Sequence, residues 1–428
     1  MPLAETSLAF ALHGAALAVA EVLAGRNLNE ALAGLWRKWP DLPPGQRGAV
    51  QDLAYSTLRC HGRGDFFLAR LMQKPPAAAV RALLLVALSR LEARPEEAHT
   101  IVDQAVEAAG ALSRGKSKAL ANGVLRNFLR RRAELEAAVS QDEAAHWQHP
   151  HWWIARLRSA YPDRWRAILE AGNGRPPMTL RPNRRRVAAT DFLTRLAAAD
   201  LPARLLEGGA ILLERPLPVE RLPGFGEGLV SVQDAGAQRA ANLLDVHDGM
   251  RVLDACAAPG GKTAHVLELA SVDLLALDSD GGRALRISEN LFRLGLAAKV
   301  ATADCRELDT WWDGREFDRI LADVPCTAAG VVRRHPDAKW LRREGDIAQF
   351  ARTQEKILAA LWRVLAPGGK LLYATCTLFP EENGRQVAAF AARQEDCMRL
   401  PIGGAPDLQL LPNEEHDGFY YALLQKQA

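Results

Sequence analysis

The stretch RVLDACAAPGGKTAHVLELASVDLLALD (residues 251–278) decides the fold class of this chain. Two short apolar runs, each bounded by turn residues, flank a glycine-containing loop and a helical stretch. Similar apolar runs follow at 299–304, 317–325 and 369–376, with amphipathic helical stretches between them. Strands that alternate with helices predict a mainly parallel, doubly wound, Rossmann-like α/β sheet from about residue 236 to residue 428.

Acidic residues and thiols follow the apolar runs. In an open α/β sheet, ligands bind beyond the carboxyl ends of the strands. One aspartate at such a place is ordinary turn chemistry. Four aspartates with two cysteines predict instead a single ligand crevice, formed by Asp254, Asp278, Asp304, Asp323, Cys326 and Cys376.

The loop after the first run indicates the kind of ligand. Gly260 and Gly261 allow close approach of the backbone, and Asp278 stands where an acidic residue accepts hydrogen bonds from a ribose. The phosphate-binding G-x-G-x-x-G pattern is absent, because Ala257 and Ala258 occupy its tightest positions. We therefore expect a ligand with a ribose and no pyrophosphate, which S-adenosylmethionine fits.

A nucleotide-binding P-loop is the rival interpretation, since GGKT resembles the end of a Walker A motif. That motif needs a glycine five residues before Gly261, and Cys256 stands there. The backbone does not easily follow the phosphate-cradling path with a side chain at that position. The P-loop is the weaker reading.

The rest of the chain divides into two further regions. Residues 1–142 are rich in Ala and Leu at helical spacing and predict an all-helical domain. Residues 143–235 have a mixed pattern and predict a small α+β subdomain. Basic stretches at 113–118, 126–132 and 180–186 have two open interpretations, solvated polypeptide or contact with RNA phosphates.

Composition limits the function classes. The formal charge of +3 is too small to indicate nucleic-acid binding by itself. Six cysteines without a CxxC pair fit neither a disulfide framework nor a zinc site, so we expect no metal and a reducing, cytoplasmic location. Residues 8–25 predict an amphipathic helix and no signal peptide, and no window is apolar enough for a membrane span.

Two thiols beside a methyl donor suggest a particular acceptor. Nitrogen and oxygen acceptors need no cysteine, whereas C5 of a pyrimidine is too poor a nucleophile to take a methyl group directly. Addition of a thiolate to C6 activates C5, which is covalent catalysis. Loss of the C5 proton and of the thiol then needs acid–base help. Asp323 is placed to bind N3 and N4 of the base.

Four blocks resemble the RNA cytosine-C5 methyltransferases of the NOL1/NOP2/Sun group. They are DACAAPGGKT (254–263), LALDSD (275–280), ADVPCTAAGVVRRHPDAKW (322–340) and YATCTLFPEENGRQV (373–387). In addition, residues 100–131 resemble the NusB-like RNA-binding domain. The resemblance covers nearly the whole chain. It implies an enzyme that methylates a cytosine of 16S ribosomal RNA, at the position numbered 967 in the family substrate.

The resemblance also implies residue roles. Cys376 would attack C6, Cys326 would assist breakdown of the adduct, and Asp323 would lie beside methyl donor and base. The opposite assignment, in which the Pro-Cys thiol attacks as in DNA cytosine enzymes, stays open. S-adenosylmethionine would contact Cys256, Ala257, Ala258, Pro259, Gly260, Gly261, Lys262, Asp278, Asp304 and Asp323. Residues 333–337 would line the RNA side.

The resemblance has departures and implies partners. Thr327 and Thr377 follow the two cysteines where the family commonly has serine, and Ala328 replaces a usual glycine. We expect free 16S RNA as the partner, a monomer, and no membrane. The alternative function is a non-catalytic RNA-binding scaffold for ribosome assembly with a vestigial site. Cys60, Cys305 and Cys397 are expected to be structural or incidental.

Overall fold

The computed structural model describes residues 3–427, and their contacts form two compact units. The first unit comprises the chain up to residue 174 together with residues 332–344, and the second comprises residues 175–331 and 345–428. The predicted domain boundaries at 142/143 and 235/236 do not coincide with these limits, and they stay predictions.

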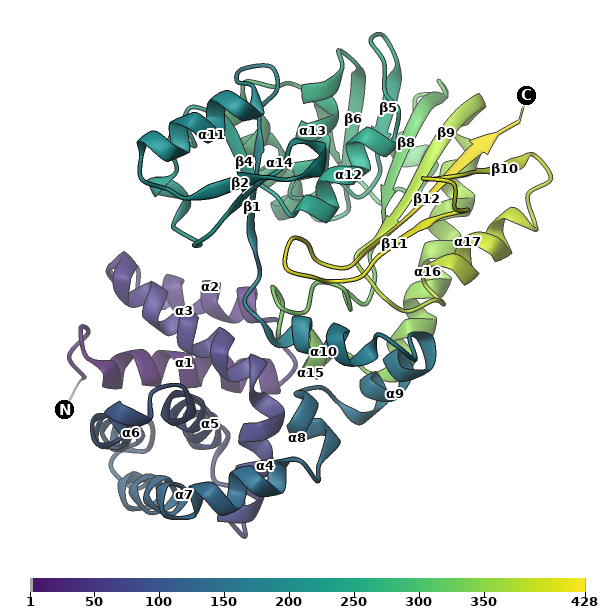
Figure 1. Cartoon of the computed structure of the whole chain (residues 1–428). Coiled ribbons are helices and arrows are strands. Elements are labelled where there is room, and N and C mark those ends of the chain that lie inside the picture. Colours follow the sequence, from purple (N-terminus) through teal and green to yellow (C-terminus); the bar gives the residue numbers. More distant parts are fainter. Residues whose placement is uncertain (1–2, 428) are drawn as a thin grey trace. The chain divides into compact units, whose positions relative to one another are not determined.

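The first unit is helical, as predicted for the N-terminal region (Figure 1). Ten of the sixteen residues of the first helix are buried, so this helix lies inside the unit and is less amphipathic than expected. It begins after Ser7, whose side chain accepts a hydrogen bond from the Phe10 N–H. The helices are α1 (Leu8–Leu23), α2 (Leu28–Lys38), α3 (Pro44–Arg59), α4 (His61–Leu71), α5 (Ala78–Ala93), α6 (Ala98–Ser113), α7 (Lys118–Val139), α8 (Glu143–Trp147), α9 (His151–Ala160), α10 (Trp165–Asn173) and α15 (Ala338–Leu341).

The basic stretches of the first unit have partners within the protein. Phe128, which stands among arginines in the sequence, is fully buried in the helical core. Lys118 pairs with Glu107, and Arg132 pairs with a glutamate one turn later. Exposed pairs of this kind contribute about 0–1 kcal/mol to stability. Contact of this region with RNA phosphates stays a prediction.

Residues 332–344 leave the α/β region and pack among the helices of the first unit. The Leu28 N–H at the start of α2 donates a 2.9 Å hydrogen bond to Asp337 Oδ2. Lys339 has no exposed side-chain surface, and its Nζ donates to Asn173 Oδ1 at 2.9 Å and to the Arg59 carbonyl at 3.3 Å. Burial lowers the pKa of Lys339 to about 7. This segment overlaps residues 333–337, which the resemblance assigned to the RNA side.

The second unit begins with a small antiparallel sheet. Its strands are β1 (Met178–Pro182), β2 (Ala203–Leu205), β3 (Ile211–Leu213) and β4 (Val230–Val232), in the order β2-β3-β1-β4. Helix α11 (Ala189–Ala198) buries Phe192 and Leu196 against this sheet. The arrangement is the small α+β subdomain that the sequence predicted.

Arg181, at the end of β1, explains why basic residues occur in this subdomain. It is 3% exposed and forms a two-pronged ion pair with Glu268, with N–O distances of 2.9 and 2.8 Å. Its Nη1 also donates to the Gly261 carbonyl at 2.7 Å. Arg184 and Arg185 donate to backbone carbonyls. These contacts give part of the basic run 180–186 internal partners, and contact of its exposed arginines with RNA phosphates stays a prediction.

The large sheet has the order β10-β12-β9-β8-β5-β6-β7, and β11 pairs with β12. The strands from β9 to β7 are parallel neighbours, whereas β12 runs antiparallel to β9. All five predicted strands are present. The bounds are β5 (Arg251–Asp254), β6 (Asp273–Asp278), β7 (Lys299–Thr302), β8 (Phe317–Asp323), β9 (Leu365–Thr375), β10 (Cys397–Leu400), β11 (Leu408–Leu410) and β12 (Phe419–Lys426).

Helices cover both faces of this sheet (Figure 1). Successive residues of β5 point to opposite faces, so Val252 packs with one helix set and Leu253 with the other. The first set is α12 (Ala235–Leu243), α13 (Gly261–Leu269) and α14 (Gly281–Leu294), and the second is α16 (Glu344–Arg363) and α17 (Gly384–Ala391). This confirms the predicted Rossmann-like fold, with its switch in strand order between β5 and β8.

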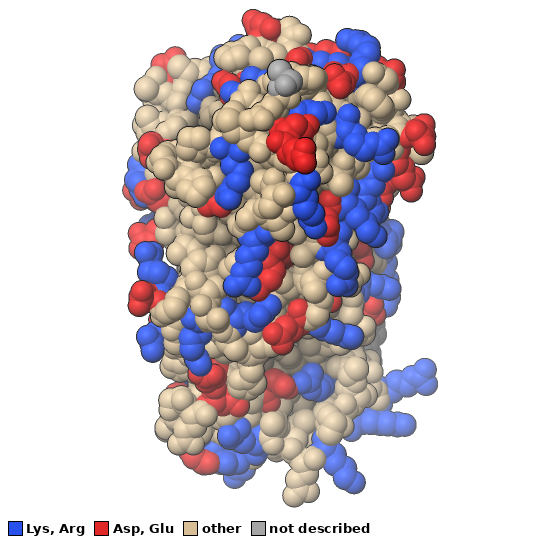
Figure 2. Space-filling view, turned by 90° about the vertical axis from the view of Figure 1, so that its right-hand side faces the viewer, with Lys and Arg blue, Asp and Glu red and all other residues tan. Residues whose placement is uncertain are grey.

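The surface is mixed in charge. Figure 2 shows Lys and Arg side chains interspersed with Asp and Glu on the face drawn there. Within residues 3–427, no helix has the length and apolar character needed to cross a membrane.

Candidate active site

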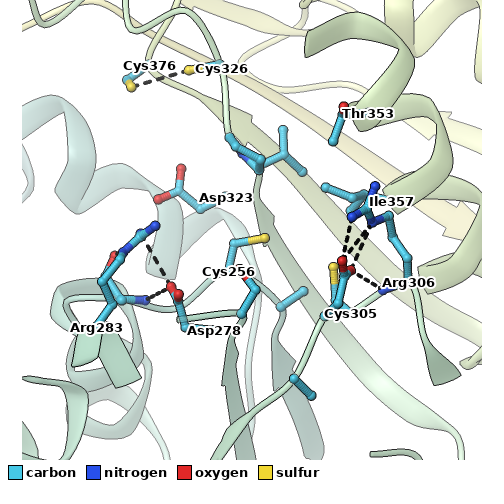
Figure 3. Close-up of a pocket in the computed structure, with 17 residues that line it drawn as sticks. Cys256, Asp278, Arg283, Cys305, Arg306, Asp323, Cys326, Thr353, Ile357 and Cys376 are labelled. Atoms are coloured by element: carbon cyan, nitrogen blue, oxygen red, sulfur yellow. Dashed lines mark hydrogen bonds and ion pairs between the residues drawn. The ribbon is translucent and has the colours of Figure 1, made fainter. Parts of the chain in front are cut away.

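A cavity of about 290 Å³ opens at the carboxyl ends of the parallel strands (Figure 3). Neighbouring parallel strands end at the same edge of a sheet, so residues distant in sequence meet there. The cavity is lined by Ala255, Cys256, Ala258, Asp278, Ser279, Arg283, Ala303, Asp304, Cys305, Arg306, Asp323, Val324, Pro325, Cys326, Thr353, Ile357 and Cys376.

Two thiols lie at one side of this cavity (Figure 3). Cys326 follows β8 and Cys376 follows β9, and their sulfur atoms are 3.4 Å apart. The hydrogen bond with Cys376, together with burial, raises the pKa of Cys326 well above its usual range. Cys326 therefore holds its proton firmly, while Cys376 is the more exposed of the two.

Asp323 and Lys262 form an ion pair beside the thiols. Lys262 Nζ lies 2.5 Å from Asp323 Oδ2. Burial lowers the pKa of Lys262, but the charge of Asp323 and the hydrogen bond to it outweigh burial and raise that pKa overall. Lys262 also interacts electrostatically with Cys376. Lys262 therefore keeps its positive charge beside the Asp323 carboxylate.

Asp278, at the end of β6, is held by the loop that follows β5. Its Oδ2 accepts from the Ala258 N–H at 3.2 Å, and its Oδ1 accepts from the Asp280 N–H at 3.1 Å. Arg283 lies 3.3 Å from the same carboxylate. Asp278 is almost fully buried yet lines the cavity, so its remaining lone pairs face a ligand space.

The far wall of the cavity carries Asp304 and a second pair of cysteines. Arg306 hydrogen-bonds to Asp304 and thereby lowers the pKa of that carboxyl. Hydrogen bonding to Cys305, followed by burial, raises the pKa of Cys256 well above its usual range. Cys305, which we expected to be structural or incidental, lines the cavity, and that expectation stays a prediction.

Several predicted residues do not line the cavity. Asp254 was expected in the crevice, but it is buried and accepts a 2.7 Å hydrogen bond from Thr263 Oγ1 inside the domain. The reason is that its side chain points to α13. Five of the predicted cofactor residues also do not line the cavity: Ala257, Pro259, Gly260, Gly261 and Lys262. Of these, Lys262 contacts the cavity residue Asp323.

The loop after Cys326 has an unfavourable backbone conformation. Ala328 has a φ of 62°, in the left-handed region that favours glycine. The departure from the glycine that the resemblance led us to expect therefore falls at a residue whose backbone conformation favours glycine. Two residues later, the Gly330 N–H donates to the Cys376 carbonyl, and the Gly330 carbonyl accepts from the Gly418 N–H. The Cα of Gly330 also lies against the backbone of Gly418.

A buried glutamate stands behind the two thiols, and the sequence analysis gave it no role. Glu382 belongs to the PEENG segment after Cys376 and has no exposed surface. Its carboxylate accepts hydrogen bonds from Thr327 and Thr377, the residues that follow the two cysteines. Its segment lies in the block 373–387 that carries the resemblance, but a glutamate in a turn-like segment resembles an ordinary surface residue, so its burial was not predicted.

Family models match three successive regions of the chain. The model of the 16S rRNA methyltransferase RsmB/F matches residues 241–425, a ferredoxin-like domain of RsmF/B-like methyltransferases matches residues 149–220, and the NusB family matches residues 10–130.

Curated relatives and one solved structure resemble nearly the whole chain, and another solved structure resembles about two thirds of it. The ribosomal RNA small subunit methyltransferase B of Yersinia pestis bv. Antiqua (strain Angola) is 43% identical over 96% of this chain and 97% of its own. The crystal structure of PH0851 matches with a TM-score of 0.82 at 22% identity, over 98% of this chain and 99% of its own. A methyltransferase homolog protein from Pyrococcus horikoshii matches with a TM-score of 0.59 at 26% identity, over 67% of this chain and 98% of its own.

Proposed function

Because the chain belongs to the 16S rRNA methyltransferase RsmB/F family, we propose that it methylates C5 of a cytosine in 16S ribosomal RNA. The methyl donor is S-adenosylmethionine, and the target is the cytosine numbered 967 in the family substrate. The observation that carries the proposal is the pair of thiols, 3.4 Å apart, on the wall of the strand-end cavity.

The residues of the cavity fit S-adenosylmethionine. Asp278 offers buried acceptor oxygens suited to ribose hydroxyls, and Asp304 lines the same cavity. The negative charge of Asp323 suits a ligand that carries positive charge. Lys262, at the start of α13, suits its carboxylate. When bound, the cofactor supplies the methyl group that C5 receives.

Cys376 is the nucleophile in this proposal. The neighbouring ammonium of Lys262 stabilises negative charge on its sulfur, so the Cys376 thiol can release its proton to solvent and become a thiolate, with the Cys326 sulfur within hydrogen-bond distance. The thiolate bonds to C6 of the cytosine, and the electron pair of the C5–C6 double bond makes C5 nucleophilic. Asp323 hydrogen-bonds to the base and stabilises the charge that develops on addition.

Cys326 serves the second half of the reaction. The largest cause of its raised pKa is its hydrogen bond with Cys376. That cause disappears once the Cys376 sulfur is bonded to carbon, and Cys326 becomes easier to deprotonate. Cys326 gives its proton to solvent, and the resulting thiolate takes the C5 proton. The electrons of the C5–H bond then re-form the double bond, and the Cys376 sulfur leaves as a thiolate.

Trapping tests the proposal. RNA containing 5-fluorocytosine should form a stable protein–RNA adduct, detected by gel shift after denaturation, because fluorine does not leave C5 as a proton does. Cys376→Ala should abolish the adduct. Cys326→Ala should let an adduct with ordinary RNA accumulate. Cys397→Ala, a half-buried cysteine outside the cavity, is the matched control and should behave as wild type.

The outcomes separate the alternatives. If Cys376→Ala accumulates the adduct and Cys326→Ala abolishes it, the two roles are exchanged. If wild-type protein binds RNA without any adduct, the non-catalytic scaffold is correct.

Methylation of free 16S RNA compared with assembled small subunits tests the preferred substrate, which we propose is free RNA. The monomeric state and the cytoplasmic location stay predictions.

A further inference from the structure

The two thiols come from separate loops, and one side chain ties these loops together. The Thr327 and Thr377 hydroxyl oxygens are 2.7 Å apart. Both lie on Glu382 Oε1, at 2.5 Å and 3.1 Å. The Thr327 N–H donates to Glu382 Oε2 at 2.9 Å. A single carboxylate therefore contacts the residue next to each cysteine.

A third element joins the same carboxylate. Gln354 in α16 donates to Glu382 Oε2 at 3.1 Å and to the Pro325 carbonyl at 3.0 Å. Pro325 precedes Cys326, so the loop is held on both sides of that cysteine. Across residues 3–427, no basic side chain pairs with Glu382, and its carboxylate oxygens accept hydrogen bonds from the neutral donors of Thr327, Thr377 and Gln354. A buried carboxyl without a counterion is costly unless such donors satisfy it.

The loop needs this restraint. Ala328, directly after Thr327, has its backbone in the left-handed region, which costs about 1–2 kcal/mol for a residue with a Cβ. A strained conformation persists only where surrounding contacts determine it. Glu382 does not line the cavity, so it does not touch the base or the methyl donor. Its influence has to act through the positions of the cysteines.

We propose that Glu382 is a positioning residue that sets the separation of the Cys326 and Cys376 sulfurs by holding Thr327 and Thr377 on one carboxylate. The proposal rests on the proposed thiol chemistry for its functional meaning. The hydroxyls at positions 327 and 377 are then the required feature, which serine and threonine share. Threonine in place of the family's common serine at positions 327 and 377 therefore keeps the hydroxyl that the carboxylate binds.

The first test needs no RNA. In equilibrium with oxidised glutathione, the two protein thiols form one disulfide while the reagent is reduced to two thiols, and mass spectrometry quantifies the linked peptides. Glu382→Gln replaces one acceptor oxygen by an NH₂ group. It should lower the effective concentration of the two thiols about tenfold or more. The neighbouring Glu381→Gln is the matched control, since Glu381 pairs with Arg385.

The second test uses the adduct with 5-fluorocytosine RNA. A displacement of about 1 Å at reacting atoms costs about 10²-fold in rate, so Glu382→Gln should slow adduct formation to that extent with an unchanged RNA KM. Thr327→Val should act likewise, and Thr327→Ser should retain the wild-type rate. The Glu382→Gln/Thr327→Val double variant should lose no more than the worse single variant, because both remove the same contact.

Wild-type values for Glu382→Gln in both tests would overturn the proposal. So would additive losses in the double variant. If Glu382→Gln does not fold, as judged by circular dichroism, Thr377→Val leaves the carboxylate in place, removes the hydroxyl that contacts Thr327 and Glu382, and carries the same two measurements. If wild-type protein forms no adduct, the proposed function fails, while the glutathione equilibrium still decides the role of Glu382.

Discussion

The buried ion pair between Arg181 and Glu268 allows a quantitative prediction about stability. The two side chains are 3% and 0% exposed, and the guanidinium donates four hydrogen bonds, two to Glu268 and one each to Gln233 and the Gly261 carbonyl. Glu268→Gln removes the negative charge and leaves the positive one buried. Breaking a buried pair in this way costs about 3–5 kcal/mol.

Thermal unfolding followed by circular dichroism measures this cost. At about 2–4 °C per kcal/mol for a domain of this size, the Tm should fall by about 6–20 °C. Arg204→Met is the matched control, because the exposed pair between Arg204 and Glu415 contributes about 0–1 kcal/mol. The double variant Arg181→Met/Glu268→Met removes both charges and should recover much of the loss.

The reasoning fails if Glu268→Gln lowers the Tm no more than Arg204→Met does. It also fails if the double variant is less stable than either single variant. The first result would mean that the buried charge finds water or another partner. The second would mean that the hydrogen bonds to Gln233 and Gly261, and not the charge balance, determine stability.

Three further predictions concern single residues. Ala328→Gly should raise the free energy of unfolding by about 0–1 kcal/mol, because relief of about 1–2 kcal/mol of backbone strain exceeds the entropy cost of glycine. A fall in Tm would contradict this prediction. Gly330→Ala should lower the Tm strongly, because its Cβ would meet the Gly418 carbonyl at 2.2 Å, whereas Gly226→Ala has no heavy atom within 4 Å and should be neutral. Burial raises the pKa of Asp254 to about 7, against about 4 when unfolded, so native protein binds the extra proton between these values. Its free energy of unfolding should therefore fall as pH rises from about 4 to 7. Urea titrations of Asp254→Asn should lack this slope, and an unchanged slope would refute the assignment.

Local patterns were sufficient to predict the α/β fold. The strands are short apolar runs bounded by turn residues, and the helices between them have a helical period, so each signal lies within a dozen residues. The position of Cys326 and Cys376 followed from the same patterns, because parallel strands end at one edge of the sheet. Rules of topology thus placed residues that are fifty positions apart in the sequence.

What the sequence did not reveal depends on tertiary partners. Glu382 looked like a surface residue of a turn, and only the packed structure shows its three hydroxyl and amide donors. Arg181 indicated an external anion because its partner, Glu268, lies 87 residues away. Asp254 ends a strand as Asp278 does, but its side chain points to a helix. Direction and burial of a side chain are properties of the whole fold.

The excursion of residues 332–344 has a consequence for how the molecule is dissected. The chain passes from one unit to the other at 174/175, at 331/332 and at 344/345, so no single cut yields both units complete. A fragment that ends at residue 174 would lack the lysine whose ammonium fills the space beside Asn173, and it would leave the first N–H of α2 without its carboxylate. The thirteen residues 332–344 belong to the helical unit but are encoded inside the α/β unit. Replacing either unit by a foreign domain would therefore require this insertion to be matched to the helical unit as well.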